Sequence, residues 1–428
     1  MRLGDNRLPG LHVVEHEVAV PLDHDDPGGE QIRVYARELV APRRRDADLP
    51  WLLYLTGGPG VPGPRPTGRS GWLGRALQDH RVLLLDYRGT GRSTPQTRQT
   101  LAGRSPADQA RRLACFRADA IVHDAEVLRR EVTGDEPWSL LGQSYGGFVA
   151  TTYLSAAPAS LTRVMVTGGV PPVGRSPKEV YLATAARVAE RWARFAERYP
   201  DDPARLDRVA DRVAGGDVRL PSGDPLTVPR LQSLGMTLGY ADGLERLHYL
   251  LETAFVDAHR DGSAGELTDD FLAAVDSATS FATRPLYALL HESIYCDGGS
   301  SGWAAQQVTA GVAEASPEAR PLLPTGEAIF RWMFEVDGAL APLRDAADLL
   351  ATYEWPVLYD HDCLAANDVP VAAAVFHDDM YVESSFSLDA AQRIGNARTW
   401  VTNELGHDGL RTDARVIERL LDMTAGEA

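Results

Sequence analysis

The sequence predicts an α/β fold, with a mostly parallel central sheet flanked by helices and an inserted helical cap domain. Short runs that are apolar throughout alternate with helical stretches in the first third of the chain and return near its end. Strands of this kind are buried on both faces of a parallel sheet. After Pro171-Pro172 helical patterns dominate, and 428 residues exceed what one hydrophobic core usually holds. We therefore expect a core domain of residues 1–171 and 350–428 and a helical cap of residues 172–349.

The individual elements follow from apolar periodicity and turn signals. The predicted strands are Leu11–Pro21, Gln31–Val40, Trp51–Leu55, Arg81–Leu85, Ser139–Gly142, Arg163–Val166, Pro370–Phe376 and Arg398–Thr402. Helical periodicity predicts helices over Ala107–Val132, Gly146–Ala156, Ser176–Tyr199 and Val416–Met423.

Charge and composition exclude several classes of protein. The net charge of −17 disfavours nucleic-acid binding, which needs clustered basic residues, and also docking on anionic membranes. The sequence has no apolar run of the length that a membrane helix needs, and its first residues lack a secretory signal pattern. Cys115, Cys296 and Cys363 are far apart, which indicates free thiols rather than a disulfide frame or a metal site. We expect a cytoplasmic protein, and the sequence leaves its oligomeric state open.

Ser144 is the predicted nucleophile. It stands in Gly142-Gln143-Ser144-Tyr145-Gly146, between an apolar run and a small-residue helix. That is the strand–turn–helix setting of a nucleophile elbow, in which glycines allow a tight turn that exposes the serine hydroxyl. Thr56-Gly57-Gly58-Pro59-Gly60 follows another apolar run and predicts the oxyanion loop. We expect the backbone N–H groups of Gly58 and Tyr145 to form the oxyanion hole, with Gly57 as the alternative to Gly58.

A serine nucleophile also needs a general base and an acid that orients the base. His407 lies just beyond the last predicted strand, and Asp379 follows the strand that ends at Phe376. Asp379 is preferred over Asp378 because one further residue takes the side chain clear of the strand. The order Ser, Asp, His predicts a serine hydrolase of the α/β-hydrolase fold. The long segment between Ser144 and Asp379 requires a large insertion, in agreement with the predicted cap.

These motifs resemble those of the proline iminopeptidases (prolyl aminopeptidases), which are α/β-hydrolases with a helical cap. The resemblance runs from about Leu52 to Leu410. Its motifs are Gly57-Gly58-Pro59-Gly60, Asp86-Tyr87-Arg88-Gly89-Thr90-Gly91-Arg92-Ser93, Gly142-Gln143-Ser144-Tyr145-Gly146-Gly147, Asp379-Met380 and Gly406-His407. The second of these motifs is interpreted as a turn that supports the oxyanion loop. The sequence departs from the family at Thr56, where a histidine is common.

The resemblance implies a serine peptidase that releases N-terminal proline from small peptides. The family holds the substrate amine with cap glutamates, and Glu292 matches its motif of Glu followed three residues later by Tyr. The second glutamate is Glu327 or Glu335. Neither a metal nor an organic cofactor is implied.

Other functions remain open at this stage. A different esterase or amidase, or an acyltransferase, could use the same three residues, because the cap pocket sets specificity. A non-catalytic ligand receptor on this fold is a further alternative, although such proteins often lack one of the three residues.

Overall fold

The computed structural model describes residues 1–256 and 265–427. Within these residues a nine-stranded sheet has the order β1-β2-β3-β5-β4-β6-β7-β8-β9. The strands are β1 (Arg2–Leu8), β2 (Leu11–Pro21), β3 (Gln31–Val40), β4 (Trp51–Leu55), β5 (Arg81–Asp86), β6 (Trp138–Gln143), β7 (Leu161–Thr167), β8 (Val371–Phe376) and β9 (Ala397–Thr402). From β5 to β9 the neighbouring strands are parallel, whereas β1, β2 and β3 join by antiparallel pairing.

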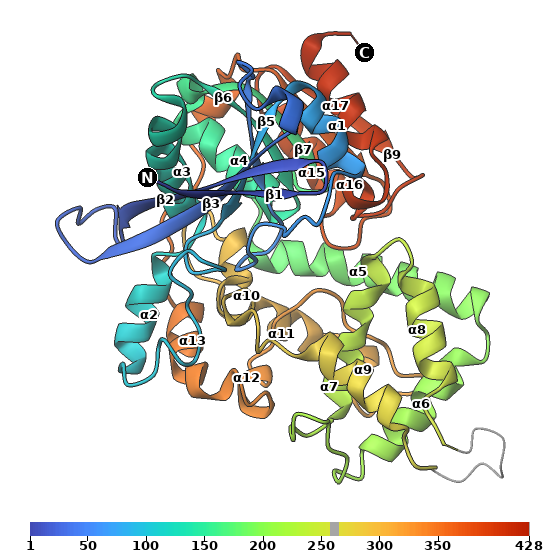
Figure 1. Cartoon of the computed structure of the whole chain (residues 1–428). Helices are drawn as coiled ribbons and strands as arrows, with labels where there is room; N and C mark the ends of the chain where they lie inside the picture. The colour runs from blue at the N-terminus through green and yellow to red at the C-terminus, as the bar shows by residue number, and fades with distance from the viewer. Residues whose placement is uncertain (257–264, 428) are drawn as a thin grey trace.

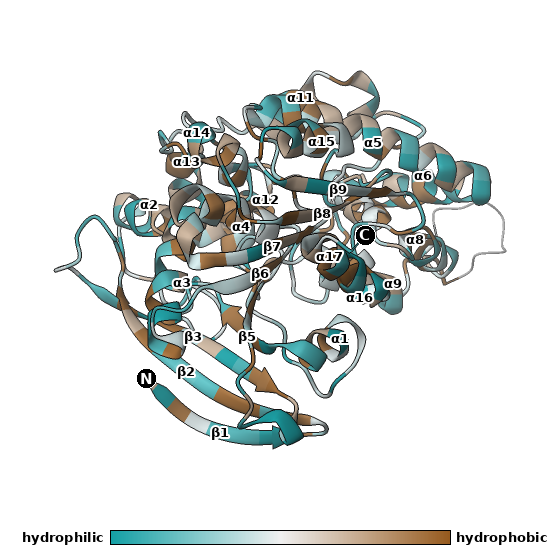
Figure 2. Ribbon diagram, turned by 90° about the horizontal axis from the view of Figure 1, so that it is seen from above, coloured by the Kyte–Doolittle hydropathy of each residue, from teal (hydrophilic) through white to brown (hydrophobic). Residues whose placement is uncertain are grey.

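The central strands are apolar because both faces of the sheet are covered. In β4, Leu52 packs into the hydrophobic cluster that includes α17, whereas its neighbour Leu53 packs into the cluster that includes α3 and α4. Successive side chains of a strand point to opposite faces, so an uninterrupted apolar run is what burial on both sides requires. Figure 2 shows these hydrophobic strands in the middle of the molecule, between layers of helices.

The helices of the sheet region alternate with the strands along the chain and cover both faces of the sheet. They are α1 (Gly71–Asp79), α2 (Pro106–Ala114), α3 (Ala118–Thr133), α4 (Tyr145–Ala156), α15 (Ser384–Gln392), α16 (Gly409–Thr412) and α17 (Arg415–Ala425). Helix α4 packs against β6 and α3, and α17 packs against β7, β8 and α1. Short 3-10 helices occur at Pro42–Arg44, Pro158–Ser160, Ser233–Gly239, Glu292–Tyr295, Ala313–Ala315 and Ala341–Leu343.

A long helical segment separates β7 from β8, although these two strands are neighbours in the sheet. Its helices are α5 (Pro177–Arg198), α6 (Asp202–Val213), α7 (Val228–Gln232), α8 (Gly243–Glu252), α9 (Asp269–Thr279), α10 (Pro285–Leu290), α11 (Ala304–Ala310), α12 (Met333–Val336), α13 (Arg344–Ala351) and α14 (His361–Ala365). Figure 1 shows most of them as a layer below the sheet.

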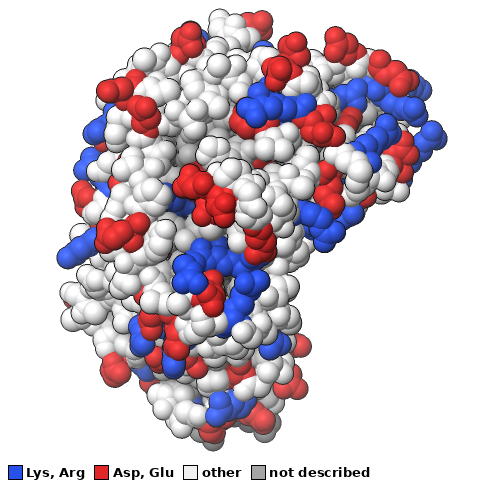
Figure 3. Space-filling view, turned by 90° about the vertical axis from the view of Figure 1, so that its left-hand side faces the viewer, with Lys and Arg blue, Asp and Glu red and all other residues white. Residues whose placement is uncertain are grey.

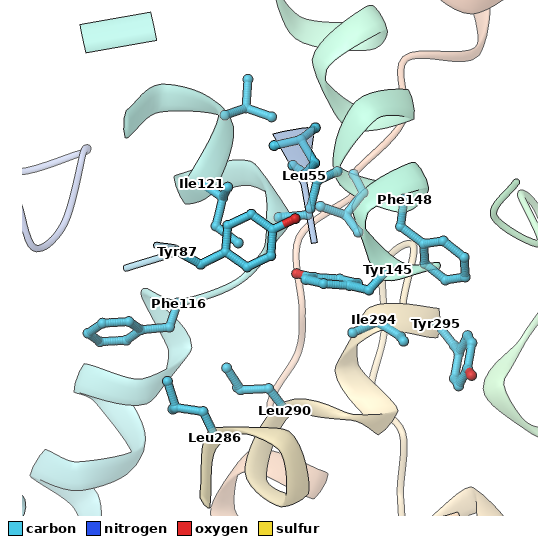
Figure 4. Close-up of a cluster of buried hydrophobic side chains, with 14 of the residues drawn as sticks. Leu55, Tyr87, Phe116, Ile121, Tyr145, Phe148, Leu286, Leu290, Ile294 and Tyr295 are labelled. Carbon is cyan, nitrogen blue, oxygen red and sulfur yellow. The ribbon is translucent and has the colours of Figure 1, made fainter. Parts of the chain in front are cut away.

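The buried side chains of the helical segment belong to two different hydrophobic clusters. Side chains of α5, α6, α8 and α9 form a hydrophobic cluster of their own, whereas α10 and the turn that follows it pack into the core of the sheet. Figure 4 shows this junction, with Leu286 and Leu290 of α10 near Tyr145 and Phe116. The predicted division into a core of residues 1–171 and 350–428 and a cap of residues 172–349 stays a prediction.

The strands predicted from the sequence are confirmed, three of them to the residue: Leu11–Pro21, Gln31–Val40 and Trp51–Leu55. One predicted helix is wrong in extent, because Ala107–Val132 is two helices. The chain turns after Ala114, and Arg117 adopts an extended backbone before α3 begins. Strand β1 was not predicted, because its exposed and polar residues carry no apolar alternation.

Acidic and basic side chains are interspersed on the surface shown in Figure 3. Local ion pairs such as Arg112 with Glu30 account for part of this mixture. None of the helices in the described ranges is long and apolar enough to cross a membrane.

Candidate active site

Ser144 lies at the sharp turn between β6 and α4. Its backbone has φ 55° and ψ −125°, a left-handed conformation that costs a non-glycine residue energy. The turn is held by hydrogen bonds from the Ser144 N–H to the Thr167 carbonyl (3.0 Å) and from the Gly147 N–H to the Ser144 carbonyl (2.7 Å). The predicted elbow is therefore present, with the serine hydroxyl at the carboxyl end of β6.

The glycines on either side of Ser144 are required by close packing. A Cβ atom at Gly142 would lie 2.4 Å from the Gly146 carbonyl oxygen, and one at Gly146 would lie 2.0 Å from the Leu55 carbonyl oxygen. Both distances are far below van der Waals contact, and the obstacles are backbone atoms that cannot rotate away. The Gly-x-Ser-x-Gly pattern thus follows from the local geometry of the turn.

Ser144, His407 and Asp379 form a hydrogen-bonded row. His407 Nε2 lies 2.9 Å from Ser144 Oγ, and His407 Nδ1 lies 2.7 Å from Asp379 Oδ2. The other carboxylate oxygen of Asp379 accepts hydrogen bonds from the backbone N–H groups of Tyr381 (2.8 Å) and Val382 (3.1 Å). Asp379 and His407 are both buried. The structure thus brings together the three residues chosen from the sequence.

The neighbouring carboxylate of Asp378 points elsewhere. It pairs with Arg194 (2.7 Å) and with His377 (2.7 Å). The hydrogen bond from Arg194 is the main reason that the pKa of Asp378 falls to about 2. Of the two carboxylates considered from the sequence, Asp379 is the one beside the imidazole.

The environment of His407 suits proton transfer. Burial alone would lower the pKa of the imidazole, but the charge of Asp379 and its hydrogen bond outweigh burial and raise the pKa above its ordinary value. Since the Nδ1 atom faces a carboxylate, it carries the proton in the neutral ring. The Nε2 atom is then a free base facing Ser144 Oγ.

The loop after β4 lies against the serine. Gly57 approaches so closely that a Cβ atom there would be 3.3 Å from Ser144 Cβ. In the described part of the chain, the N–H groups of Gly57, Gly58 and Tyr145 donate to no acceptor. Gly57 and Gly58 both line the cavity that contains Ser144. The geometry leaves either glycine available as the second donor beside Tyr145.

Asp86 supports this loop, as the motif after β5 led us to expect. Its buried carboxylate accepts a hydrogen bond from the Gly63 N–H (3.1 Å) and pairs with both terminal nitrogens of Arg65 (2.7 and 2.6 Å). The next residue, Tyr87, donates its hydroxyl to the Thr56 carbonyl (2.8 Å). The departure at Thr56 does not remove the bond from Tyr87, because that bond uses the backbone carbonyl of Thr56 and not its side chain.

A cavity of about 460 Å³ opens over the serine. Its wall contains Ser144, His407, Gly57 and Gly58 from the sheet region and Tyr240, Arg284, Tyr287 and Glu327 from the helical segment. Ser144 and His407 therefore lie between the sheet and the helical segment inserted after β7. This is the arrangement in which an insertion can determine which molecules reach a nucleophile.

Of the three candidate glutamates in the described chain, Glu327 is the one that lines this cavity. The hydroxyl of Tyr287 donates a hydrogen bond to its Oε1 atom. The pattern of apolar residues gave no signal for Tyr287. Tyr287 precedes His291 by four residues, and the two rings stack at 5.1 Å. That Tyr287 lies beside Glu327 becomes visible only once the fold is known.

The structure does not place Glu292 and Glu335 in the cavity. Glu292 is buried beside α11, where its carboxylate accepts hydrogen bonds from the N–H groups of Ala304 (3.2 Å) and Ala305 (2.9 Å). Burial raises the pKa of Glu292 to about 7. Glu335 is half exposed on α12 and pairs with Arg331. The expectation that Glu292 binds a substrate amine finds no geometric support, because its oxygens already hold a helix terminus.

The strand order of the sheet, the sharp turn at Ser144 and the glycine-rich loop after β4 together define the class of protein. Residues 50–209 match the family model of the α/β hydrolase fold. The protein is an α/β-hydrolase.

Comparison with known proteins narrows this class. The chain is 48% identical to a proline iminopeptidase of Aeromonas sobria over 97% of both chains. It is 36% identical to a proline iminopeptidase of Aspergillus aculeatus over 94% of this chain and 90% of the relative. The chain belongs to the proline iminopeptidase family, and it is an enzyme of the hydrolase class. A solved structure, of a proline iminopeptidase-related protein from Thermus thermophilus, is 18% identical and covers 96% of this chain and 98% of its own, with a TM-score of 0.41.

Proposed function

We propose that this protein is a serine peptidase that releases N-terminal proline from small peptides through an acyl-enzyme. The observation that carries the proposal is the hydrogen-bonded row of Ser144, His407 and Asp379 in a cavity that also contains the carboxylate of Glu327. The two relatives named proline iminopeptidase, which match nearly the whole chain, support the choice of substrate.

In the first step Ser144 Oγ attacks the prolyl carbonyl carbon while His407 Nε2 accepts the hydroxyl proton. The attack needs this base because a serine hydroxyl is a weak nucleophile at its own pKa. Asp379 keeps the proton of the imidazole on Nδ1 and stabilises the imidazolium that forms. His407 then gives its proton to the departing peptide amine, and the prolyl group remains as an ester on Ser144.

The negative charge of the tetrahedral intermediate falls on the former carbonyl oxygen. We assign its stabilisation to the N–H groups of Tyr145 and Gly58, with Gly57 as the alternative to Gly58. In the second step a water molecule, deprotonated by His407, attacks the ester and releases proline. No step requires a metal ion or an organic cofactor.

Glu327 is assigned to the secondary ammonium of the N-terminal proline. A carboxylate on the wall of a partly enclosed cavity holds an ammonium by a charge-assisted hydrogen bond. The hydrogen bond from Tyr287 fixes the position of this carboxylate. Glu292 would then not contact the substrate, and its role would be to hold the first turn of α11. Residues 172–349 would form the cap that carries Glu327, and the three free thiols favour a cytoplasmic location.

A panel of aminoacyl-p-nitroanilides tests the proposal. We expect L-proline p-nitroanilide to be cleaved at least about tenfold faster than the alanine and leucine compounds, since the free amine and the ring must both fit. The N-acetylated proline compound serves as the control and should be cleaved poorly, because it has no ammonium. Cleavage of simple esters alone, with no turnover of the proline anilide, would favour a different acyl hydrolase.

A further inference from the structure

Arg284 places a cation on the wall of the active-site cavity that the proposed reaction does not use. In the described ranges its guanidinium contacts the rings of Phe281 and Tyr287 and makes no hydrogen bond or ion pair. The other arginine of the cavity wall, Arg411, is already paired with Asp408. Arg284 is therefore the arginine of this wall that has no ion-pair partner among the described residues.

The position of Arg284 is fixed by its neighbours. Its N–H donates to the Phe281 carbonyl (3.0 Å), and Pro285 begins α10 directly after it. The guanidinium carbon lies 5.2 Å from the ring centroid of Tyr287 and 5.6 Å from that of Phe281. The two rings stack on each other at 5.9 Å. Contact with aromatic faces orients a guanidinium without occupying its N–H donors.

Tyr287 contacts both Arg284 and Glu327. The face of the Tyr287 ring carries the guanidinium, and its hydroxyl binds the Glu327 carboxylate. The two charged groups both contact this one ring, yet they form no ion pair with each other within the described residues. Because one charged group lies over the ring face and the other at the ring hydroxyl, the ring keeps the two apart on one wall of the cavity.

We propose that Arg284 binds the free C-terminal carboxylate of a short peptide whose N-terminal ammonium is held by Glu327. The inference rests on the proposed function and deepens it, because it selects dipeptides and tripeptides over longer chains and over peptide amides. A guanidinium matches a carboxylate with two parallel hydrogen bonds, which neutral groups cannot replace. The acidic chain as a whole repels an anionic group, so a local cation is needed to hold one.

The test compares two substrates that differ only at the carboxyl end, prolylglycine and prolylglycinamide. For the wild type we expect kcat/KM to be about tenfold higher for the free acid, since a hydrogen bond to a charged group is involved. In Arg284→Gln the ratio of the two values should fall to near one. Arg284→Lys keeps the charge but loses the paired donors, and its ratio should be intermediate.

Arg411→Gln is the matched control, because Arg411 lines the same cavity with its guanidinium already paired. Its ratio should stay close to that of the wild type. Equal kcat/KM values for the two substrates in the wild type would overturn the inference while leaving the proposed function intact. A ratio unchanged in Arg284→Gln would also overturn it. Cleavage of neither peptide, and of no proline anilide, would overturn the proposed function together with the inference.

Discussion

His407 Nε2 lies 2.9 Å from Ser144 Oγ, although 263 residues separate the two in sequence. Ser144 follows β6, Asp379 follows β8 and His407 follows β9, and these strands run parallel in one sheet. The carboxyl ends of parallel strands meet at a single edge of a sheet, which is where ligands bind in such folds. The topology thus brings a hydroxyl, an imidazole and a carboxylate together without any local sequence relationship.

The first prediction concerns Asp379, the carboxylate that binds the imidazole of His407. Asp379→Asn should lower kcat by about 10⁴, because an amide no longer holds the imidazole in the required tautomer. Neutral His407 is the active form, and the charge of Asp379 contributes to its raised pKa. In the wild type the acid limb of kcat/KM should therefore lie above pH 6.5, the ordinary value for histidine, and it should move to lower pH in the variant. Rate–pH profiles measure both effects.

Asp378→Asn is the control for this variant, since Asp378 pairs with Arg194 and not with the imidazole. Its profile should match that of the wild type. A similar loss of kcat in both variants would show that the effect is structural and not a property of Asp379.

The second prediction concerns substrate binding. Glu327→Gln removes the carboxylate from the cavity while keeping an acceptor for the Tyr287 hydroxyl. We expect kcat/KM for L-proline p-nitroanilide to fall by about 30-fold, which corresponds to a charge-assisted hydrogen bond. Steady-state kinetics provide the measurement. Glu335→Gln, on the surface of α12, is the control and should change little. Equal kinetics in the two variants would remove Glu327 from the binding site.

The third prediction concerns stability. The pKa of Glu292 is raised from 4.5 to about 7 by burial, so folding favours its protonated form. The stability that this protonation provides is fully present below pH 4.5 and is lost as the pH rises through 7. Glu292→Gln has no such titration. Between about pH 5 and pH 8 the free energy of unfolding of the wild type should therefore fall relative to the variant by about 2 kcal/mol.

Urea titrations at several pH values measure this difference, with Glu335→Gln as an exposed control. A difference between Glu292→Gln and the wild type that does not change with pH would mean that Glu292 has an ordinary pKa in the folded protein.

The fourth prediction concerns the elbow. Gly146→Ala introduces a Cβ atom 2.0 Å from the Leu55 carbonyl oxygen, so the strand or the helix must shift. We expect a loss of about 3 kcal/mol in the free energy of unfolding, together with loss of activity. Gly4→Ala is the control, because nothing lies within 4 Å of a Cβ atom there. A variant of Gly146 with unchanged thermal unfolding would contradict this packing.

The sequence predicted those parts of the molecule in which one local signal determines the structure. The elbow around Ser144 needs glycines wherever it occurs, and the buried strands must be apolar, so both patterns are visible in the chain. Strand β1 carries no such pattern because its side chains are exposed on the edge of the sheet. The break between α2 and α3 was missed because both halves share one helical periodicity.

The helical segment between β7 and β8 was predicted less well, because the residues that line the cavity are brought there by contacts between distant segments. Glu292 and Glu327 are both glutamates among helices, and no spacing shows that only one of this pair faces Ser144. Tyr287, which binds Glu327, comes from α10, whereas Glu327 lies in the irregular segment before α12. Arg284 stands out only through its lack of an ion pair in the described structure. Such relationships depend on tertiary packing, which apolar periodicity does not encode.

The assignment of Ser144 as the nucleophile is tested by identifying the residue that reacts with a fluorophosphonate. We expect mass spectrometry to find a single adduct on the peptide that contains Ser144, and no adduct in a folded Ser144→Ala variant. The wild type should lose turnover of L-proline p-nitroanilide in proportion to labelling. Labelling that persists in Ser144→Ala, or full activity of that variant, would contradict the claim that Ser144 is the nucleophile.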